Sequence, residues 1–384
     1  MNSYLLQLKA SASIAMMDRA RQLKAQGYNV ISLAGGEPDF DTPTLIMEAG
    51  IRAIRDGRTH YTTGRGILTL RERIAQKLNE ENSIVCGPDS ILVTPGGKYA
   101  IYLCVFCCIN PGDEVMILDP SWVSYAPMVE MVGGKPVKVP LSFCNNYSIT
   151  DDLLERYCTS RTRILILNTP NNPTGRVLTA EESDAIRTFM NTHRDVLLIA
   201  DEVYEKIIFD GRKHISMGSL GEIADRVITV NSFSKSAAMT GWRIGYLCAS
   251  KSLVDAIYLC YQHTLTCISE FSQIAAVTAL DCHKEMEQMR ESYARRRDML
   301  ILGLQQIPQA TCLLPEGAFY AWCRFDKDGM DSDAICEYLL EKAQVVCVSG
   351  NAYGLGSERC VRMCFASADR DIQDAVKRIE AAMK

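Results

Sequence analysis

The segment Thr229–Tyr246, TVNSFSKSAAMTGWRIGY, holds one lysine among small hydroxyl residues and one arginine eight positions later. A lysine with small polar neighbours can attack an aldehyde and form an imine. An arginine guanidinium binds phosphate through two parallel hydrogen bonds. The spacing therefore predicts that Lys235 binds an aldehyde cofactor and that Arg243 binds the phosphate of that cofactor.

Polar residues after two other apolar runs could bind the ring of such a cofactor. Asp201 follows the run VLLIA, and an ionised carboxylate there would keep a pyridine nitrogen protonated, which makes the ring an electron sink. Tyr204 and Asn172 could reach the phenolic oxygen of the ring. Each residue also has a purely structural interpretation. Asp201 could cap the following helix, and the NNPTG sequence at Asn172 is a good turn.

Further candidates concern the phosphate, the ring face and the substrate. Gly96-Gly97-Lys98 follows the run ILVT and opens an expected helix, so its backbone N–H groups form a phosphate seat that Ser232 and Ser234 could complete. Trp122 could stack on a planar ring or could be a domain-interface aromatic residue. Arg362 lies in the apolar sequence VRMCFA and needs an anion, either a substrate carboxylate or a structural partner.

Several other motifs are set aside. Ser232 and Lys235 match the S-x-x-K pattern of penicillin-binding enzymes, but the S-D-N and K-T-G motifs are absent from the chain. The sequence Gly64-Arg65-Gly66 lacks the third glycine of a dinucleotide fingerprint. The Cys104–Cys107 pair lies in an apolar helix, and the histidines form no ligand cluster, so we expect no metal site. The basic run Arg295–Arg297 is interpreted as a solvated helix face.

Composition is that of an ordinary globular protein. The chain has 384 residues, of which 47% are hydrophobic and 23% are charged, with a net charge of -5. Because the basic residues are scattered, we expect no nucleic-acid partner. No apolar run approaches the roughly 20 residues that span a bilayer, and no signal peptide is recognisable, so we expect no membrane partner and a cytoplasmic location. The 16 cysteines are interpreted as buried free thiols.

The alternation of apolar runs and helical stretches predicts the fold class. Between residues 90 and 235, short runs rich in Val and Ile alternate with helices, which indicates an α/β fold with a mainly parallel sheet flanked by helices. Ligands bind at the carboxyl ends of such strands. We expect an N-terminal segment 1–46 that contributes to the small domain, a large cofactor-binding domain 47–282, and a smaller α+β domain 283–384.

Taken together, the motifs resemble the class I/II aminotransferases, which are pyridoxal-phosphate enzymes of fold type I. Within that family they resemble the bacterial aspartate aminotransferase-like subgroup, and the resemblance extends over nearly the whole chain. It is carried by LAGGEPDFDTP, HYTTGRG, VTPGGK, NPGDEV, DPSWVSYAPMV, NTPNNPTG, ADEVYEKI, SFSKSAAMTGWRIGY, EGAFY and VRMCFA, in the family order.

The resemblance implies a role for each candidate residue. Lys235 would be the Schiff-base lysine and proton shuttle, with Asp201 at the pyridinium nitrogen. The remaining cofactor contacts would come from Asn172 and Tyr204 at the phenolic oxygen, Trp122 at the ring face, and Gly97, Lys98, Ser232, Ser234 and Arg243 at the phosphate. Arg362 and the Gly36 backbone would bind the substrate α-carboxylate, with Trp122 and Asn172 nearby. Tyr61 would cross to the phosphate of a second subunit, which implies a homodimer with shared active sites.

The implied reaction is a ping-pong transfer of an amino group from an L-amino acid to a 2-oxo acid such as 2-oxoglutarate. A lysine at the position of Lys98 contacts the distal carboxylate from the neighbouring subunit in some acidic-substrate relatives, which favours aspartate and glutamate. Ala237 and the segment HTLTCISEFSQ depart from the usual pattern and bear on side-chain choice. The alternatives are a pyridoxal-phosphate-dependent β-lyase and an aminotransferase for aromatic amino acids or alanine.

Overall fold

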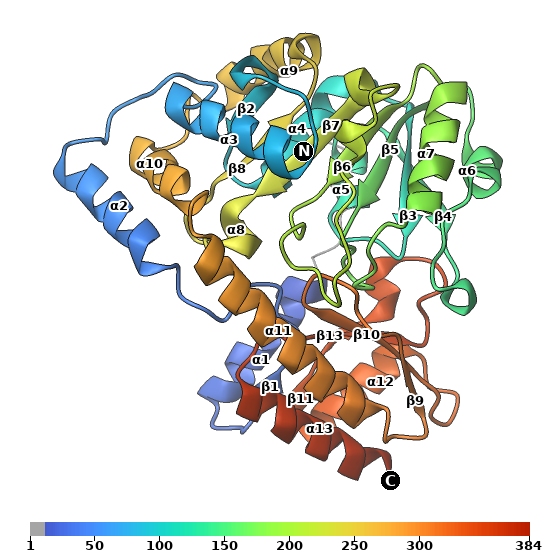
Figure 1. Ribbon diagram of the computed structural model, residues 1–384. Helices are drawn as coiled ribbons and strands as arrows, with labels where there is room; N and C mark the ends of the chain where they lie inside the picture. Colours follow the sequence, from blue (N-terminus) through green and yellow to red (C-terminus); the bar gives the residue numbers. More distant parts are fainter. Residues whose placement is uncertain (1–11) are drawn as a thin grey trace.

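The computed structural model describes residues 12–384 (Figure 1). A seven-stranded sheet forms the larger part, with strand order β2-β8-β7-β6-β5-β3-β4. Its strands are β2 (Ile91–Thr94), β3 (Glu114–Asp119), β4 (Lys135–Pro140), β5 (Thr162–Asn168), β6 (Leu197–Asp201), β7 (Val227–Ser232) and β8 (Gly245–Cys248). Only β8 runs antiparallel to its neighbours. The prediction of a mainly parallel sheet is confirmed.

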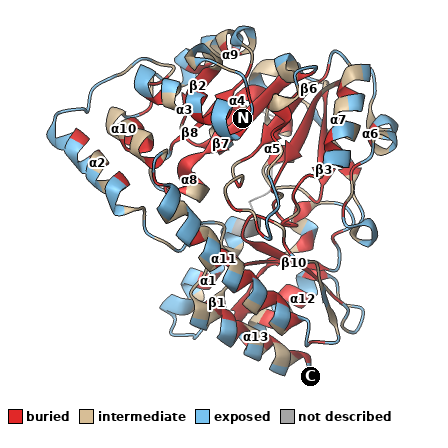
Figure 2. Ribbon diagram, viewed as in Figure 1, coloured by how far each residue is buried: buried red, intermediate tan, exposed pale blue. Residues whose placement is uncertain are grey.

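Both faces of this sheet are buried. In β5, Ile164 and Ile166 pack against α4 (Gly97–Cys108), α5 (Tyr125–Met131) and α9 (Lys251–Thr264). The alternate residues Leu165 and Leu167 pack toward α6 (Asp151–Tyr157) and α7 (Ala180–Thr192) on the other face. Successive side chains of a strand point to opposite faces, so a strand covered on both sides reads as a continuous apolar run. Apart from the edge strand β4, the strands are accordingly buried along nearly their whole length (Figure 2).

Three further helices cover the end of the sheet formed by β2 and β8. They are α2 (Thr44–Arg55), α3 (Leu68–Glu81) and α10 (Glu270–Ala279). In α3 the buried residues Leu70, Ile74 and Leu78 recur at spacings of four, which is the pattern of an amphipathic helix. They share one apolar cluster with Ile91 and Val93 of β2.

The smaller part is built on a four-stranded antiparallel sheet, β12 (Val348–Ser349), β13 (Cys360–Cys364), β10 (Tyr320–Phe325) and β9 (Ala310–Cys312), in that order. The helices α11 (His283–Leu304), α12 (Ser332–Tyr338) and α13 (Asp369–Met383) lie beside it (Figure 1). Near the N-terminus, α1 (Ala12–Ala25) leads to β1 (Ile31–Ser32), which pairs in parallel with β11 (Val345–Val346). This pairing joins the N-terminal segment to the small sheet region, while the domain boundaries at residues 46 and 282 stay predictions.

Two expectations from the sequence are wrong. Arg296 and Arg297 are 7% and 4% exposed and are not a solvated helix face. Arg296 forms ion pairs with Asp39 and Asp369, and Arg297 pairs with Asp210. Burial of these cations is tolerated because each has carboxylate partners contributed by distant segments.

The second correction concerns the cysteines. Cys312 of β9 and Cys323 of β10 are directly opposite each other in the antiparallel pair and are joined by a disulfide. They are therefore not free thiols, although the other 14 cysteines are. Within residues 12–384, no helix is long and apolar enough to cross a membrane.

Candidate active site

A cavity of about 440 Å³ opens at the carboxyl ends of the parallel strands. The strands β2, β3, β5, β6 and β7 share one direction, so the residues that follow them meet at one edge of the sheet. Twelve of the candidate residues line this cavity: Gly36, Gly97, Lys98, Trp122, Asn172, Asp201, Tyr204, Ser232, Ser234, Lys235, Arg243 and Arg362. Tyr61 does not, and its side chain is 84% exposed.

Lys235 lies on the one-turn helix α8 (Phe233–Ser236), directly after β7. The Ser232 side chain accepts a hydrogen bond from the Ser234 N–H group and thereby caps this turn. The Lys235 ammonium donates to the Gly36 carbonyl oxygen at 2.5 Å. Burial lowers the pKa of Lys235 to about 8. A substantial fraction of the amine is therefore unprotonated and nucleophilic in mildly alkaline solution.

Asp201 ends β6 and is buried beside Tyr125 of α5. The Tyr125 hydroxyl donates to Asp201 Oδ2 at 2.5 Å. Burial raises the pKa of Asp201 to about 6, and the hydrogen bond from Tyr125 opposes this rise. The Tyr125 ring also meets the Trp122 ring edge-on, with centroids 5.2 Å apart. One aromatic pair thus positions both the buried carboxylate and the indole that lines the cavity.

Sequence reasoning missed Tyr125, although a signal was present. Tyr125 follows Trp122 by three residues, a spacing that places two side chains on one face of a helical turn. Its polar partner Asp201 is 76 residues away in the chain. The two come together because β5 pairs with both β3, which leads to Tyr125, and β6, which ends at Asp201.

The expected phosphate seat is a narrow cradle of glycine backbone, serine hydroxyls and arginine. Gly96 has φ +86°, and a Cβ atom at this position would lie 2.7 Å from Arg243 Nη2. The Ser232 hydroxyl donates to the Ser234 hydroxyl at 2.9 Å, and Arg243 donates to the carbonyl oxygens of Thr240 and Pro95. Helix α4 begins at Gly97, so its free N–H groups also face this region. The cradle therefore suits a phosphate group.

Arg362 on β13 is 2% exposed and has only neutral acceptors. It donates to Asn172 Oδ1 at 3.1 Å and to the carbonyl oxygens of Ala34 and Gly35 at 2.9 Å each. Among residues 12–384, no carboxylate forms an ion pair with Arg362, and its Nε atom has no hydrogen-bond partner. A structural salt bridge is therefore not found in this part of the chain. A buried guanidinium facing a cavity without an anion suits a ligand carboxylate.

Two further side chains define the cavity. Tyr204 is 4% exposed, and its hydroxyl is 2.8 Å from the hydroxyl of Tyr320 on β10. Lys98 lies with its ammonium 4.9 Å from the centre of the Trp122 ring, in the cavity of its own chain. Burial, helped by the nearby Arg243 charge, lowers the pKa of Lys98. The Lys98 side chain thus lines the same cavity as Lys235 of its own chain.

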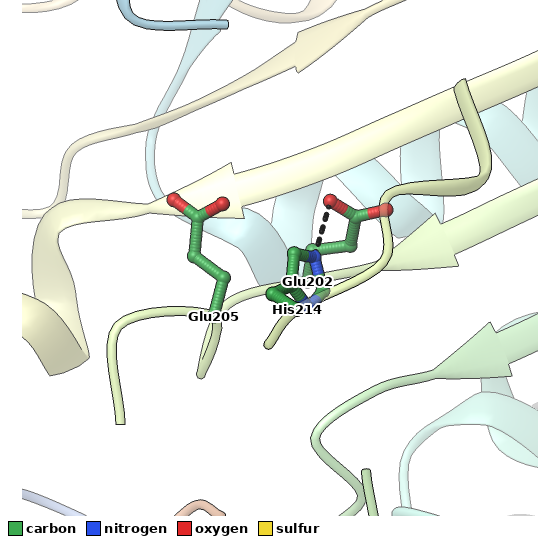
Figure 3. A group of neighbouring side chains, drawn as sticks. All are labelled: Glu202, Glu205 and His214. Atoms are coloured by element: carbon green, nitrogen blue, oxygen red, sulfur yellow. Dashed lines mark hydrogen bonds and ion pairs between the residues drawn. The ribbon is translucent and has the colours of Figure 1, made fainter. Parts of the chain in front are cut away.

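Within the described residues, Glu202, Glu205 and His214 offer ligand atoms within 4.8 Å of one another (Figure 3). These groups already have partners. Glu202 Oε2 is 2.9 Å from His214 Nε2, and the ammonium of Lys77 contacts Glu205. Burial would raise the pKa of Glu205, but the charge of Lys77 lowers it overall to about 2. We interpret the group as a buried ion-pair network that includes Glu202, the residue after Asp201.

Comparison with known proteins gives consistent matches over the whole chain. A family model described as aminotransferase class I and II matches residues 28–379. An aspartate aminotransferase from Musicola paradisiaca (strain Ech703) is 39% identical over 376 residues, covering 97% of this chain and 94% of that protein. Aromatic-amino-acid aminotransferase 2 from Thermococcus litoralis is 40% identical over 365 residues, covering 94% and 93%. The structure of Thermus thermophilus aspartate aminotransferase with maleate is similar with a TM-score of 0.95 at 34% identity, covering 100% and 99%.

Proposed function

Because the chain belongs to the class I and II aminotransferases, which use pyridoxal phosphate, we propose that it transfers amino groups from aspartate or glutamate to a 2-oxo acid. The chain is a transferase of the aspartate aminotransferase type. The ping-pong reaction with 2-oxoglutarate as acceptor and the preference for an acidic substrate are the parts that we propose.

The cavity fits pyridoxal phosphate by its donors and charges. When bound, this cofactor supplies an aldehyde carbon and a protonated pyridine ring that withdraws electrons from the substrate Cα. We assign its ring nitrogen to Asp201 and its phenolic oxygen to Asn172 and Tyr204. The ring face would lie against Trp122. Its phosphate would be held by the cradle of Gly97, Lys98, Ser232, Ser234 and Arg243.

The protein groups then have separate tasks. Arg362 binds the α-carboxylate and fixes the Cα–H bond near Lys235, which replaces a random encounter with a positioned one. The Lys235 amine, with its pKa of about 8, takes the proton from Cα and returns it on the cofactor side. Asp201 would hold the proton at the ring nitrogen, because a cation beside its carboxylate and the hydrogen bond from Tyr125 favour the charged form against the effect of burial.

One observation carries this proposal: the same cavity contains a partly buried amine of lowered pKa and a buried guanidinium without a carboxylate partner in the described chain. An amino acid is the substrate that matches both groups. Its α-carboxylate suits Arg362, and its Cα then lies within reach of Lys235. The cytoplasmic location stays a prediction.

Lys98 supports the preference for an acidic side chain. Its ammonium lines the cavity in a partly desolvated position, where a distal carboxylate would offset the desolvation of the charge. Aromatic amino acids are the second candidate, because the apolar residues Ile14, Met17 and Val123 line the same cavity. The relative from Thermococcus litoralis is named for that class.

A screen of single half-reactions distinguishes these substrates. The reconstituted protein is mixed with each amino acid, and the absorbance change of the bound cofactor is followed. We expect aspartate and glutamate to react fastest. The Lys98→Met variant should lose about 10- to 100-fold more in kcat/KM for aspartate than for phenylalanine, because any weakening of phosphate binding is common to both substrates. Fast reaction of phenylalanine in the wild type with slow reaction of aspartate would reject the acidic preference. Release of pyruvate and ammonia without a 2-oxo acid would instead show a β-lyase.

We further propose a homodimer in which Tyr61 contacts the partner's cofactor phosphate. The exposed position of Tyr61, away from its own cavity, is compatible with such a role. Mixed dimers of Tyr61→Ala and Lys235→Ala chains test it. Only one of the two sites in each mixed dimer has the Lys235 amine. If the sites are shared, that site receives an intact Tyr61 from the other chain. Activity well above that of either parent dimer supports sharing, and no recovery in a confirmed mixed dimer contradicts it.

A further inference from the structure

Tyr320 lies at the centre of the candidate site, although none of the assigned functions includes it. It is the first residue of β10, and its side chain is 1% exposed. Its hydroxyl is 2.8 Å from the Tyr204 hydroxyl, and its ring lies 4.3 Å below the Arg362 guanidinium. Tyr320 therefore contacts both the group that we assign to the phenolic oxygen and the group that we assign to the α-carboxylate.

The arrangement is rigid. The rings of Tyr204 and Tyr320 meet edge-on, with centroids 5.7 Å apart and planes at 82°. A Cβ atom added to Gly36 would lie 3.2 Å from the Tyr320 hydroxyl oxygen, so this hydroxyl is held against the Gly36 backbone. Antiparallel pairing sets Trp322 opposite Arg362 and Tyr320 opposite Cys364, so β10 and β13 fix the spacing between the ring and the guanidinium.

The neighbouring charges indicate which tyrosine donates. A guanidinium over the Tyr320 ring favours negative charge on that residue and makes its hydroxyl the more acidic of the pair. In a neutral pair the more acidic hydroxyl is the better donor. Tyr320 then donates to Tyr204, which leaves the proton of Tyr204 free to point into the cavity.

We propose that Tyr320 is a positioning residue that directs the Tyr204 proton toward the cofactor's phenolic oxygen and links it to the arginine that binds the α-carboxylate. This inference rests on the proposed function. To the proposed function it adds a contact path that runs from Arg362 on β13, through Tyr320 and Tyr204, to the cofactor.

The test is a pH titration of the visible absorbance of the cofactor bound to Lys235. Tyr204 stabilises the deprotonated chromophore by donating to its phenolic oxygen. In Tyr320→Phe that donation weakens, and the chromophore pKa should rise by about 0.5 to 1 pH unit. Gly36→Ala should act in the same direction because its Cβ atom displaces the Tyr320 hydroxyl.

The matched control is Tyr293→Phe. Tyr293 is also fully buried in the same apolar cluster, but its hydroxyl has no hydrogen-bond partner among the described residues. This variant should leave the chromophore pKa unchanged. In a Tyr204→Phe background, Tyr320→Phe should have no further effect, because its influence runs through Tyr204.

The outcomes separate this inference from the proposed function. A wild-type protein that binds no cofactor after reconstitution contradicts both. A wild type that titrates normally, with Tyr320→Phe and Gly36→Ala both unshifted, overturns the role of Tyr320 alone. An equal shift in the Tyr204→Phe background also overturns it, since Tyr320 would then act by another route.

Discussion

Replacement of Lys235 by methionine should stabilise the cofactor-free protein at neutral pH. The pKa of Lys235 falls from its ordinary value of 10.5 to about 8 in the folded chain because desolvation disfavours the charged amine. Lowering the pKa by roughly 2.5 corresponds to about 3 kcal/mol of destabilisation at pH 7. The variant also loses the hydrogen bond from Lys235 to Gly36, which is worth about 1 kcal/mol. We therefore expect a net gain of about 2 kcal/mol.

The pH dependence distinguishes this charge effect from simple packing. Between pH 8 and 10.5 the unfolded chain binds more protons at Lys235 than the folded chain, so the wild type gains stability as the pH rises. Below pH 8 both states are protonated, and the full penalty remains. The charge contribution should fall from about 3 kcal/mol at pH 7 to below about 1 kcal/mol at pH 10.

Urea denaturation of the cofactor-free wild type and variant at pH 7 and pH 10 measures this difference, since titration of all other groups cancels in the comparison. The variant should be more stable at pH 7 and equal to or slightly less stable than the wild type at pH 10. The same difference at both pH values would show that packing, not a desolvated charge, causes the effect. A less stable variant at pH 7 would refute the reasoning outright.

The remaining predictions concern the supports of the site. Tyr125→Phe removes a donor to Asp201 and should raise the carboxyl pKa above about 6, so that cofactor affinity at pH 7 falls about tenfold by absorbance titration; unchanged affinity would contradict this. Arg362→Lys should raise KM for every amino acid about 100-fold, because an ammonium cannot bind a carboxylate bidentately, and steady-state kinetics would show it. Glu205→Gln removes the nearer of the two carboxylates beside the buried Lys77, leaving Glu81 at 3.8 Å, and should cost about 2 kcal/mol in urea denaturation; a neutral effect would argue against the ion-pair network.

The sequence predicts several cavity residues because they stand at the ends of apolar runs. Asp201 and Asn172 each follow a buried strand of one parallel sheet, and such strands bring their carboxyl ends together whatever lies between them in sequence. Lys235 and Arg243 are close in the chain, so their proximity needed no tertiary information. Lys98 is identified by position, but its orientation over Trp122 depends on the packing of α4.

The missed residues depend on contacts that no local pattern contains. Tyr125 and Tyr320 look like ordinary core tyrosines, because their polar partners Asp201 and Tyr204 lie 76 and 116 residues away. The burial of Arg296 was mispredicted for the same reason. A basic run on a helix is usually solvated. Arg296 can be buried because Asp39 and Asp369, from other segments of the chain, form ion pairs with it.

The most direct test of the central claim is to locate the cofactor on the chain. The wild-type protein is reconstituted with pyridoxal phosphate, reduced with borohydride, digested and analysed by mass spectrometry, with Lys98→Met as a control that removes the other lysine of the cavity. We predict one pyridoxyl adduct, on the peptide that contains Lys235, in both proteins. An adduct on any other lysine, or no adduct on a folded wild-type protein, would contradict the account.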